Sequence, residues 1–470
     1  MSERPGTAAS PLRVAIVGAG PTGFYAAEQL LKQPAVVVEV DMFDRLPTPF
    51  GLVRNGVAPD HQKIKSVTAA FDRTASHPRF RFFGGVEFGK DVTLEDLREH
   101  YHQIFYSTGA QTDRRMGIPG EDLAGSHPAT EFVAWYNGHP DYRHLTFDLD
   151  QERAAVIGVG NVAVDVARIL CRTPAELATT DIADYALEAL AQSRIKQVYL
   201  LGRRGPAQAA FTNPEIKELG ELADAGIAVV PEEVTLDPLS RAALEKTPDR
   251  AITKKVEILR SYVDRPPTGK SRRLALRFLV SPVELVGNTA GHVSAIRLVR
   301  NELTATAAGT LQATPTNRFE DLDVGLVFRS VGYRGVPLPG VPFNDKWAVI
   351  LNEKGRVLDA ETRTPVPGEY TGGWIKRGPT GVIGTNKPDA AETVAGMMED
   401  LARDVLLRPS QPDAASVEAL VGQRTSRWFS YPDWRRLDAM EIERGRALGR
   451  PRVKFTSVEE MLAALGRPLA

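Results

Sequence analysis

The chain has 470 residues, too many for one hydrophobic core, so two or three domains are expected. With 43% hydrophobic and 25% charged residues it has an ordinary globular composition, and its net charge of −1 indicates neither a nucleic-acid nor a membrane-surface partner. No run approaches the roughly 20 apolar residues that cross a bilayer. Because Met1–Ser10 lacks the apolar core of a secretory signal, we expect a cytoplasmic location without membrane insertion.

Cys171 is the one cysteine of the sequence. A single cysteine cannot form an intramolecular disulfide, a Cys-x-x-Cys redox pair or a four-thiolate iron–sulfur site. Any redox chemistry must therefore use a bound cofactor, and a disulfide reductase is excluded. Because Cys171 follows Ile169 and Leu170, a buried inert thiol is favoured over a functional one. No metal site is predicted.

A strand–turn–helix pattern opens the chain. Arg13–Val17 is a short β-branched run, Gly18–Gly23 is a glycine-rich turn, and a helix pattern follows over 24–32. In dinucleotide-binding folds such glycines allow the tight turn, the approach of the pyrophosphate and close helix packing. The next strand, Val36–Phe43, leads to Asp44, which is placed to bind ribose hydroxyls. A plain tight turn is the alternative, but the combined pattern favours a dinucleotide site.

The same pattern returns after an intervening strand at Ile104–Thr108. Ala154–Ile157 is a strand, Gly158–Ala163 the turn, and Gln197–Leu201 the second strand, which ends at Arg203–Arg204. Guanidinium groups bind a 2′-phosphate that an acid would repel, so we predict NADPH over NADH; two solvated arginines on a turn are the alternative. Two such units imply two dinucleotides, because a hydride needs a donor and an acceptor.

The later segments complete an α/β pattern. The region 231–275 is rich in proline and charge and is interpreted as a surface excursion, whereas Leu322–Gly332 is predicted to be a buried strand. Tyr370–Asn386 is glycine-rich and leads into a helix pattern, Ala390–Leu406. We expect one nucleotide domain interrupted by another, with 1–112 and 335–470 forming the first and 113–334 the second.

Five segments resemble the adrenodoxin reductase family, which includes bacterial NADPH–ferredoxin reductases; they are Pro49–Arg54, Gly56–His61, Gly160–Arg168, Gly202–Pro206 and Gly373–Ile383. The resemblance runs in order from about residue 12 to the C-terminus. It implies a glutathione-reductase-like fold with two Rossmann-like domains, the NADP domain being inserted in the FAD domain. It also implies a ferredoxin–NADP⁺ reductase, in which electrons pass from NADPH through FAD to a ferredoxin, one at a time.

The resemblance further assigns site residues. Those that match the FAD contacts are Gly18, Ala19, Gly20, Gly23, Asp44, Gly51, Leu52, Val86, Trp374, Gly381, Val382 and Ile383. Those that match the NADP contacts are Arg114, Val159, Gly160, Asn161, Val162, Arg203, Arg204 and Glu215. Asp60, His61 and Glu218 resemble polar groups near the flavin and the nicotinamide, and we predict that His61 and Glu218 tune catalysis. A structural histidine, and an exposed helix face at Glu215 and Glu218, are the alternatives.

The external acceptor is expected to be an acidic iron–sulfur ferredoxin, since the chain has no thiolate cluster of its own. Arg250–Arg277 holds nine Lys or Arg residues against two acids and is predicted to dock this partner; a solvated basic loop is the alternative. A flavin monooxygenase is disfavoured by the lack of its fingerprint. An NADPH-sensing module would bind both cofactors without acceptor-dependent turnover.

Overall fold

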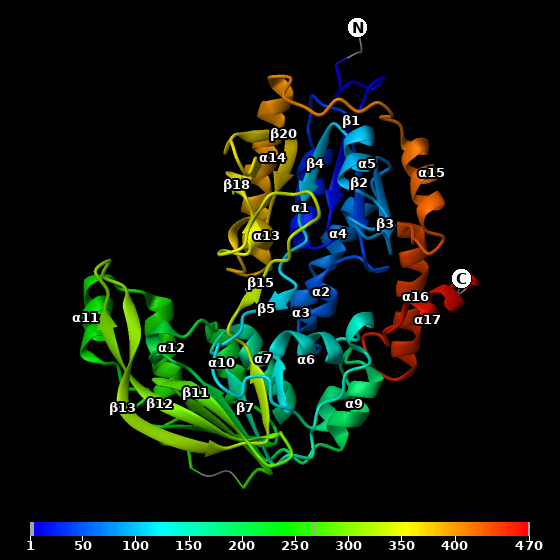
Figure 1. Cartoon of the computed structure of the whole chain (residues 1–470). Helices are drawn as coiled ribbons and strands as arrows, with labels where there is room; N and C mark the ends of the chain where they lie inside the picture. The colour runs from blue at the N-terminus through cyan, green and yellow to red at the C-terminus, as the bar shows by residue number, and fades with distance from the viewer. Residues whose placement is uncertain (1–3, 267–268, 469–470) are drawn as a thin grey trace.

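The computed structural model describes residues 4–266 and 269–468 and contains two large sheets, one above the other in Figure 1. The upper, seven-stranded sheet has the order β18-β19-β20-β4-β1-β2-β3, and the five strands from β20 to β3 are parallel. Its strands are β1 (Leu12–Val17), β2 (Val38–Asp44), β3 (Phe80–Gly84), β4 (Gln103–Tyr106), β18 (Asn352–Glu353), β19 (Arg356–Leu358) and β20 (Pro365–Thr371). Every residue of β1 is buried, as in parallel strands covered on both faces.

Helices cover both faces of this sheet. One core cluster joins it to α1 (Pro21–Leu31), α4 (Thr68–Ala75), α14 (Asn386–Ala402), α16 (Tyr431–Ala447) and α17 (Val458–Ala464). The other joins it to α5 (Leu94–His100), α13 (Trp374–Arg377) and α15 (Ala414–Arg424). Two short helices, α2 (Leu52–Asn55) and α3 (Gln62–Lys65), follow β2 and lie on the side of the lower sheet (Figure 1). We call this part of the molecule the upper unit.

The lower, six-stranded sheet is parallel throughout and has the order β6-β14-β7-β8-β10-β9. Its strands are β6 (Ser126–Pro128), β7 (Arg153–Ile157), β8 (Gln197–Leu201), β9 (Ala225–Val229), β10 (Arg272–Arg277) and β14 (Leu326–Arg329). One face packs on helices, among them α6 (Ala129–Tyr136), α7 (Asn161–Cys171), α9 (Asp184–Ala191), α10 (Asn213–Leu219) and α12 (Arg250–Arg260). We call this part the lower unit.

The opposite face of the six-stranded sheet is covered by an antiparallel sheet that the sequence patterns did not predict. It consists of β11 (Val280–Gly287), β12 (Val293–Ala305) and β13 (Leu311–Asp323). Side chains such as Leu285 and Ile296 pack on Ile157 of β7 in one core cluster. The exposed residues of β13 alternate with partly buried ones, so the apolar signal of this strand is weak.

One prediction about this region is wrong, and a second is right about a buried strand, β14, but not about its bounds. The segment 231–275 is not a surface excursion, because it includes α11 (Pro238–Lys246), α12 and the start of β10, an interior strand of the sheet. β10 was missed because it has only three buried residues, Leu274–Leu276, between arginines. The predicted strand Leu322–Gly332 is instead divided between β13 and β14.

The two chain connections between the sheets run side by side. β5 (Thr112–Asp113) pairs with β15 (Tyr333–Arg334) in antiparallel fashion. The proposed domain boundaries at 112/113 and 334/335 fall in this pair, and the whole six-stranded sheet lies between them in sequence. No helix in the described ranges is long and apolar enough to span a membrane.

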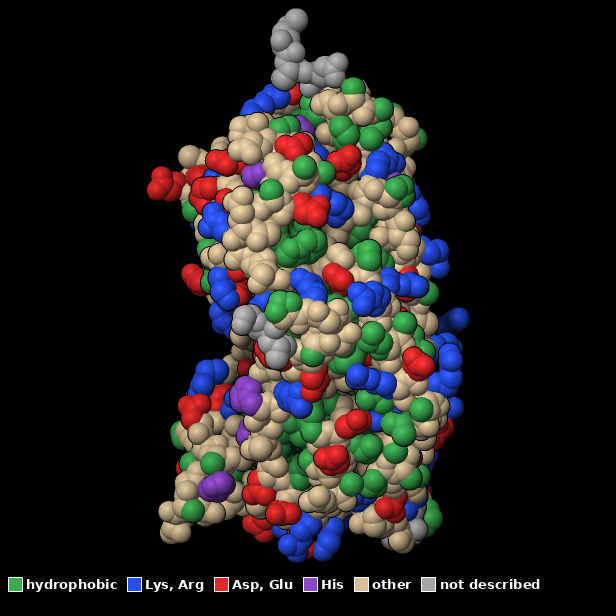
Figure 2. Space-filling view, turned by 90° about the vertical axis from the view of Figure 1, so that its right-hand side faces the viewer, with side chains coloured by type: hydrophobic (Ala, Val, Ile, Leu, Met, Phe, Trp, Pro, Cys, Tyr) green, Lys and Arg blue, Asp and Glu red, His purple; other side chains and the backbone are tan. Residues whose placement is uncertain are grey.

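The C-terminal segment contacts both units. After α16, Arg450 donates to the carbonyl oxygens of Thr180 and Ile182 in the lower unit. Lys454 donates to the carbonyl oxygens of Arg54 and Asn137, at 3.2 and 3.0 Å, and these belong to different units. The surface formed by the C-terminal helices carries interspersed basic and acidic side chains (Figure 2).

Candidate active site

The first glycine turn leaves the N-terminus of α1 open. Gly18 has φ +106°, and a Cβ added there would lie 2.6 Å from the Ser107 carbonyl oxygen. A Cβ on Gly23 would lie 2.3 Å from the Gly18 oxygen, so both positions require glycine. Gly20, the N-cap residue, offers no side-chain cap and has no atom within 4 Å of an added Cβ. The N-terminus of α1 is therefore uncapped by side chains, an arrangement that can accept an anionic group such as a pyrophosphate.

The second turn repeats this geometry at the N-terminus of α7. Gly158 has φ +131°, and an added Cβ would lie 2.1 Å from the Ser330 oxygen. Gly160 is the N-cap residue and again has open space at its Cβ position. Ala163, at the third glycine position, is fully buried. Asn161 Oδ1 accepts from the Thr212 N–H at 3.0 Å and ties the turn to α10.

Asp44 orders the first turn. Its Oδ2 accepts from the Ala19 N–H at 2.7 Å and its Oδ1 from the Leu46 N–H at 2.9 Å. The Val86 N–H donates to the Asp44 carbonyl oxygen at 2.9 Å. A Cβ on Gly51 would come within 3.0 Å of the Gly20 Cα, so two chain segments meet beside the pyrophosphate space.

Apolar side chains are exposed around the N-terminus of α1. Leu52, directly after Gly51, is 38% exposed, and Val382 is 53% exposed. Trp374 Nε1 donates to the Thr380 oxygen at 3.1 Å, which fixes the loop that carries Gly381 and leads through Ile383 into α14. α14, into which this loop leads, packs beside α1. An aromatic ring system bound here would cover this apolar surface.

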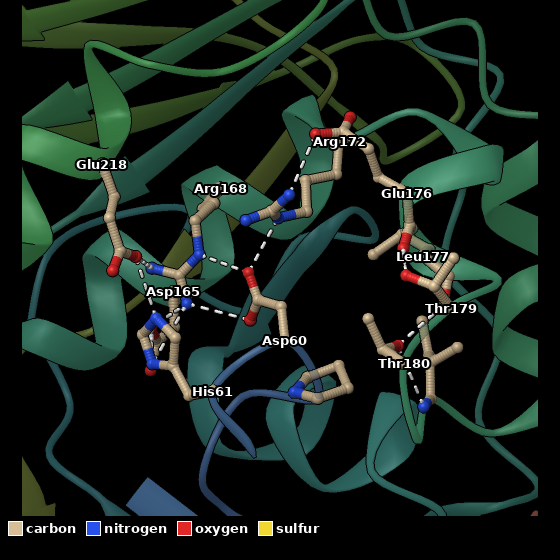
Figure 3. A network of polar contacts seen from close by, with 12 residues as sticks. Asp60, His61, Asp165, Arg168, Arg172, Glu176, Leu177, Thr179, Thr180 and Glu218 are labelled. Atoms are coloured by element: carbon tan, nitrogen blue, oxygen red, sulfur yellow. Dashed lines mark hydrogen bonds and ion pairs between the residues drawn. The ribbon is translucent and has the colours of Figure 1, made fainter. Parts of the chain in front are cut away.

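A buried guanidinium joins the two units (Figure 3). Arg168 of α7 is fully buried and donates from Nε and Nη2 to Asp60 at 2.7 and 3.1 Å. Arg172, one turn later, also donates to Asp60, at 2.7 Å. Burial alone would raise the pKa of Asp60, but the hydrogen bonds and charges of Arg168 and Arg172 lower it below its ordinary value. Asp60, before α3, is thus held as a carboxylate against the lower unit.

His61 lies beside the same guanidinium. Its Nε2 is 2.9 Å from Glu218 Oε2, and its Nδ1 is 3.4 Å from Arg168 Nη2. Glu215 is buried and accepts from Arg168 at 3.1 Å, so the alternative of an exposed helix face is wrong for this residue. The ligand atoms of His61, Glu215 and Glu218 lie within 4.8 Å of one another, but Arg168 already supplies positive charge among them.

Arg203 and Arg204 follow the C-terminal end of β8, the sheet edge that also carries Gly158. In the part of the chain that the structure describes, neither guanidinium makes an ion pair with a carboxylate. Burial and the charge of Arg203 lower the pKa of Arg204. Arg114 lies in the connection between the units, where its N–H donates to the Gly332 oxygen at 2.8 Å, two residues after Ser330, which adjoins Gly158. Val159 and Val162 are half-buried beside the second turn.

The basic stretch Arg250–Arg277 is not a single loop, so the alternative of a solvated basic loop is wrong for α12 and β10, whereas docking of a partner on this stretch stays a prediction. It comprises α12 and β10, and several of its cations have internal partners. Lys255 donates to the Ala209 oxygen, and Arg277 donates to Glu233 at 2.9 Å. The exposed cations are Arg250, Lys254, Arg260, Arg265 and Arg273.

Cys171 is fully buried, as predicted, and burial raises the pKa of its thiol to about 12. The residue that sequence reasoning missed is Arg168. Its signal was present, because Asp165 and Arg168 are the two charged residues of an otherwise apolar helix pattern in α7. A buried charge in such a helix needs partners, and these come from distant parts of the chain.

Comparison with known proteins places these features in context. A family model described as pyridine nucleotide-disulphide oxidoreductase matches residues 12–235. The NADPH-ferredoxin reductase FprA of Mycobacterium tuberculosis is 46% identical over 463 residues, which cover 96% of this chain and 98% of the relative. The human mitochondrial NADPH:adrenodoxin oxidoreductase is 42% identical over 467 residues, with 97% and 92% coverage. The solved structure of M. tuberculosis FprA in complex with NADPH superposes with a TM-score of 0.91 and 45% identity, covering 97% of this chain and 100% of that chain.

Proposed function

Because this chain belongs to the pyridine nucleotide-disulphide oxidoreductase family, and within it to the adrenodoxin reductase-like NADPH–ferredoxin reductases, we propose that its two glycine turns bind different cofactors, FAD at α1 and NADPH at α7. The protein is an FAD-dependent oxidoreductase with two Rossmann-type domains that passes electrons from NADPH to a ferredoxin-type protein. FAD, when bound, would supply the chemistry that accepts a hydride and releases electrons singly. A cytoplasmic location stays a prediction.

The assignment of FAD to the first turn is supported by the open N-terminus of α1 and the apolar surface beside it. Gly20 leaves room for a pyrophosphate, and the exposed Leu52 and Val382 offer contacts to a flavin ring. The Asp44 carboxylate holds the turn through Ala19 and keeps lone pairs for a ribose hydroxyl. We infer that the chain segments at Gly51, Val86 and 381–383 complete this site.

The assignment of NADPH to the second turn rests on Arg203 and Arg204. They stand at the strand end where an NAD-binding fold places an acid, and no carboxylate among the described residues neutralises them. We infer that they bind the 2′-phosphate, while Gly160, Asn161 and the half-buried Val159 and Val162 border the pyrophosphate. Arg114 and Glu215 are assigned to the nicotinamide half of the cofactor.

We further infer that His61 and Glu218 lie where the nicotinamide meets the flavin. They come from the two different units and bond to each other at 2.9 Å, so they bridge the space between the two turns. Glu218 is partly exposed, with 41% of its side chain accessible, whereas His61 is mostly enclosed. Their role is to position the nicotinamide for transfer of the hydride.

The proposal rests on one observation. The helix N-termini at the two glycine turns are equally open, but only in the second unit does the next strand end at an arginine pair. The test replaces the open glycines in turn. Gly20→Val should yield a folded but colourless protein that lacks FAD. Gly160→Val should keep the flavin absorbance but lose its bleaching by NADPH. The proposal is wrong if Gly160→Val, and not Gly20→Val, loses the flavin.

We place the ferredoxin dock at the N-terminal end of α12. There Asn213 of α10 donates to the Ala251 oxygen at 3.1 Å, so Arg250 and Lys254 lie near the edge of the sheet that carries the second turn. Arg273 lies at the start of β10, and because the strands are parallel this is the opposite edge. Such a cationic surface attracts an acidic partner, most strongly at low salt.

The double variant Arg250→Glu/Lys254→Glu should weaken ferredoxin binding at low salt and flatten its salt dependence. Arg273→Glu changes the charge in the same stretch but at the opposite edge of the six-stranded sheet. It should leave ferredoxin binding and its salt dependence unchanged. Ferricyanide reduction should stay normal in both variants, because this small acceptor needs no dock. If the two variants weakened ferredoxin binding equally, the docking site would not lie at the N-terminal end of α12.

A further inference from the structure

Arg168 belongs to a network of polar contacts that joins the two units (Figure 3). Its guanidinium bonds to Asp60 of the upper unit and to Asp165 and Glu215 of the lower unit, at 2.7, 2.6 and 3.1 Å. It also reaches His61 Nδ1 at 3.4 Å. A cation with no exposed surface that binds three carboxylates is fixed in place, so its direction relative to His61 is fixed as well.

This contact determines which ring nitrogen of His61 carries the proton. A guanidinium has five N–H donors and no acceptor. The two N–H groups of Arg168 Nη2 are shared among Asp165, Asp60 and His61 Nδ1, and toward Nδ1 they can only donate. Nδ1 must then present its lone pair, and the proton of the neutral ring lies on Nε2. Nε2 is 2.9 Å from Glu218 Oε2, an acceptor, which completes a consistent set of donors and acceptors.

The other groups that face His61 do not change this assignment. Glu215 and Asp165 approach Nδ1 only to 3.8 and 3.9 Å, and each already accepts from Arg168 at a shorter distance. Asp60, the preceding residue, accepts from both Arg168 and Arg172. The nearest polar atom to Nδ1 is therefore a donor.

We propose that Arg168 is a positioning residue that holds His61 in the neutral form protonated on Nε2, with this N–H directed at Glu218. The consequence for catalysis rests on the position of His61 beside the nicotinamide that was proposed above. Arg168 belongs to α7, the helix assigned to the NADPH pyrophosphate, and His61 belongs to the upper unit. The helix that binds the electron donor thus also sets the orientation of a histidine on the flavin side.

The direct test is the ¹⁵N spectrum of the FAD-containing enzyme at pH 7, with selectively labelled histidine. The resonances of His61 are identified as those missing from His61→Gln among the eight histidines. We expect a pyridine-type shift at Nδ1 and a pyrrole-type shift at Nε2. Two pyrrole-type nitrogens, or a proton on Nδ1, would overturn the proposal without any variant of Arg168.

The matched variants are Arg168→Met and Arg172→Met. Both remove a guanidinium that binds Asp60, but only the first contacts His61. Arg168→Met should allow the tautomer protonated on Nδ1, because Nδ1 can then donate to Glu215 or Asp165. Flavin reduction by NADPH should slow on the order of tenfold or more. Arg172→Met should keep the His61 spectrum.

Arg168→Lys should restore the Nε2-protonated form, since an ammonium is also a donor without an acceptor. If Arg168→Met keeps the wild-type spectrum, Arg168 does not set the tautomer. If Arg168→Met does not fold, the wild-type and Arg168→Lys spectra still decide. If His61→Gln reduces flavin at the wild-type rate, the catalytic role of His61 fails while the tautomer assignment stands.

Discussion

At the scale of single residues, the proposed preference for NADPH over NADH rests on Arg203 and Arg204. A hydrogen bond to a charged group contributes about 1.5–3 kcal/mol, so each arginine bound to the 2′-phosphate accounts for about 10- to 100-fold in affinity. Arg203→Ala and Arg204→Ala should raise the KM for NADPH by such factors and leave the KM for NADH unchanged. Arg273→Ala is the control, because its side chain lies at the other edge of the sheet. Equal effects on NADPH and NADH would contradict the assignment.

Cys171 makes a second prediction at this scale. Because burial raises the pKa of its thiol to about 12, the group stays protonated and inaccessible at neutral pH. A thiol reagent should find no reactive group in the native protein and one in the unfolded protein. Cys171→Ala should retain NADPH-dependent flavin reduction. A reactive native thiol, or loss of activity in this variant, would assign it a function that burial argues against.

The residues of the candidate site were predictable from sequence to different degrees. Gly18, Gly158 and the arginine pair belong to local patterns whose geometry follows from a strand, a turn and a helix. The cluster around Arg168 was not predictable in this way, because Asp60 and Glu215 approach it across 108 and 47 residues of sequence. Only the packing of the two units reveals that these charges compensate one another.

At the scale of elements, the two glycines of the second turn have different tasks. In Gly158→Ala the Cβ would lie 2.1 Å from the Ser330 oxygen in a left-handed backbone conformation. The φ angle alone costs about 1–2 kcal/mol, and the clash adds to it. In Gly160→Ala the Cβ enters open space, so the change in unfolding free energy should stay within about 0.5 kcal/mol. Urea unfolding without NADPH distinguishes them, and equal stabilities would contradict this division.

Helices and strands with a clear pattern of apolar residues were predicted well, and those of mixed composition were not. The strand Gln197–Leu201 was predicted with the bounds that the structure has, because its β-branched and apolar residues are bordered by turns. β10 was missed since arginines flank its short buried core, and the antiparallel sheet was missed because one face of its longest strand is polar. Local pattern identified the nucleotide turns but not the elements that complete the second sheet.

At the scale of the whole molecule, a buried ion cluster joins the C-terminal segment to both units. Asp181 of the lower unit accepts from Lys65 of α3 at 2.7 Å and lies 3.4 Å from Lys454. Burial would raise the pKa of Asp181, but the two lysines lower it to about 2. One carboxylate therefore holds together three parts of the chain that meet beside the active site.

Asp181→Asn should lower the unfolding free energy by about 3–5 kcal/mol, because two buried lysines lose their counter-charge. Since the folded pKa is below the ordinary value, the stabilisation is fully present above about pH 4 and is lost as the pH falls toward 2. The difference in unfolding free energy between wild type and variant should therefore narrow over that window. Asp184→Asn is the control: its carboxylate is half-exposed beside Arg450, and it should cost less than about 1 kcal/mol. A difference in unfolding free energy between wild type and Asp181→Asn that grows as the pH falls would contradict the assignment.

The central claim is that electrons enter from NADPH and leave to a separate ferredoxin-type protein. Anaerobic stopped-flow spectroscopy of the FAD-containing enzyme tests both steps in one experiment. We predict rapid bleaching of the flavin by NADPH, much slower bleaching by NADH, and recovery of the flavin absorbance when oxidised ferredoxin is added. Flavin that NADPH reduces but that ferredoxin leaves reduced, while ferricyanide reoxidises it, would contradict the account.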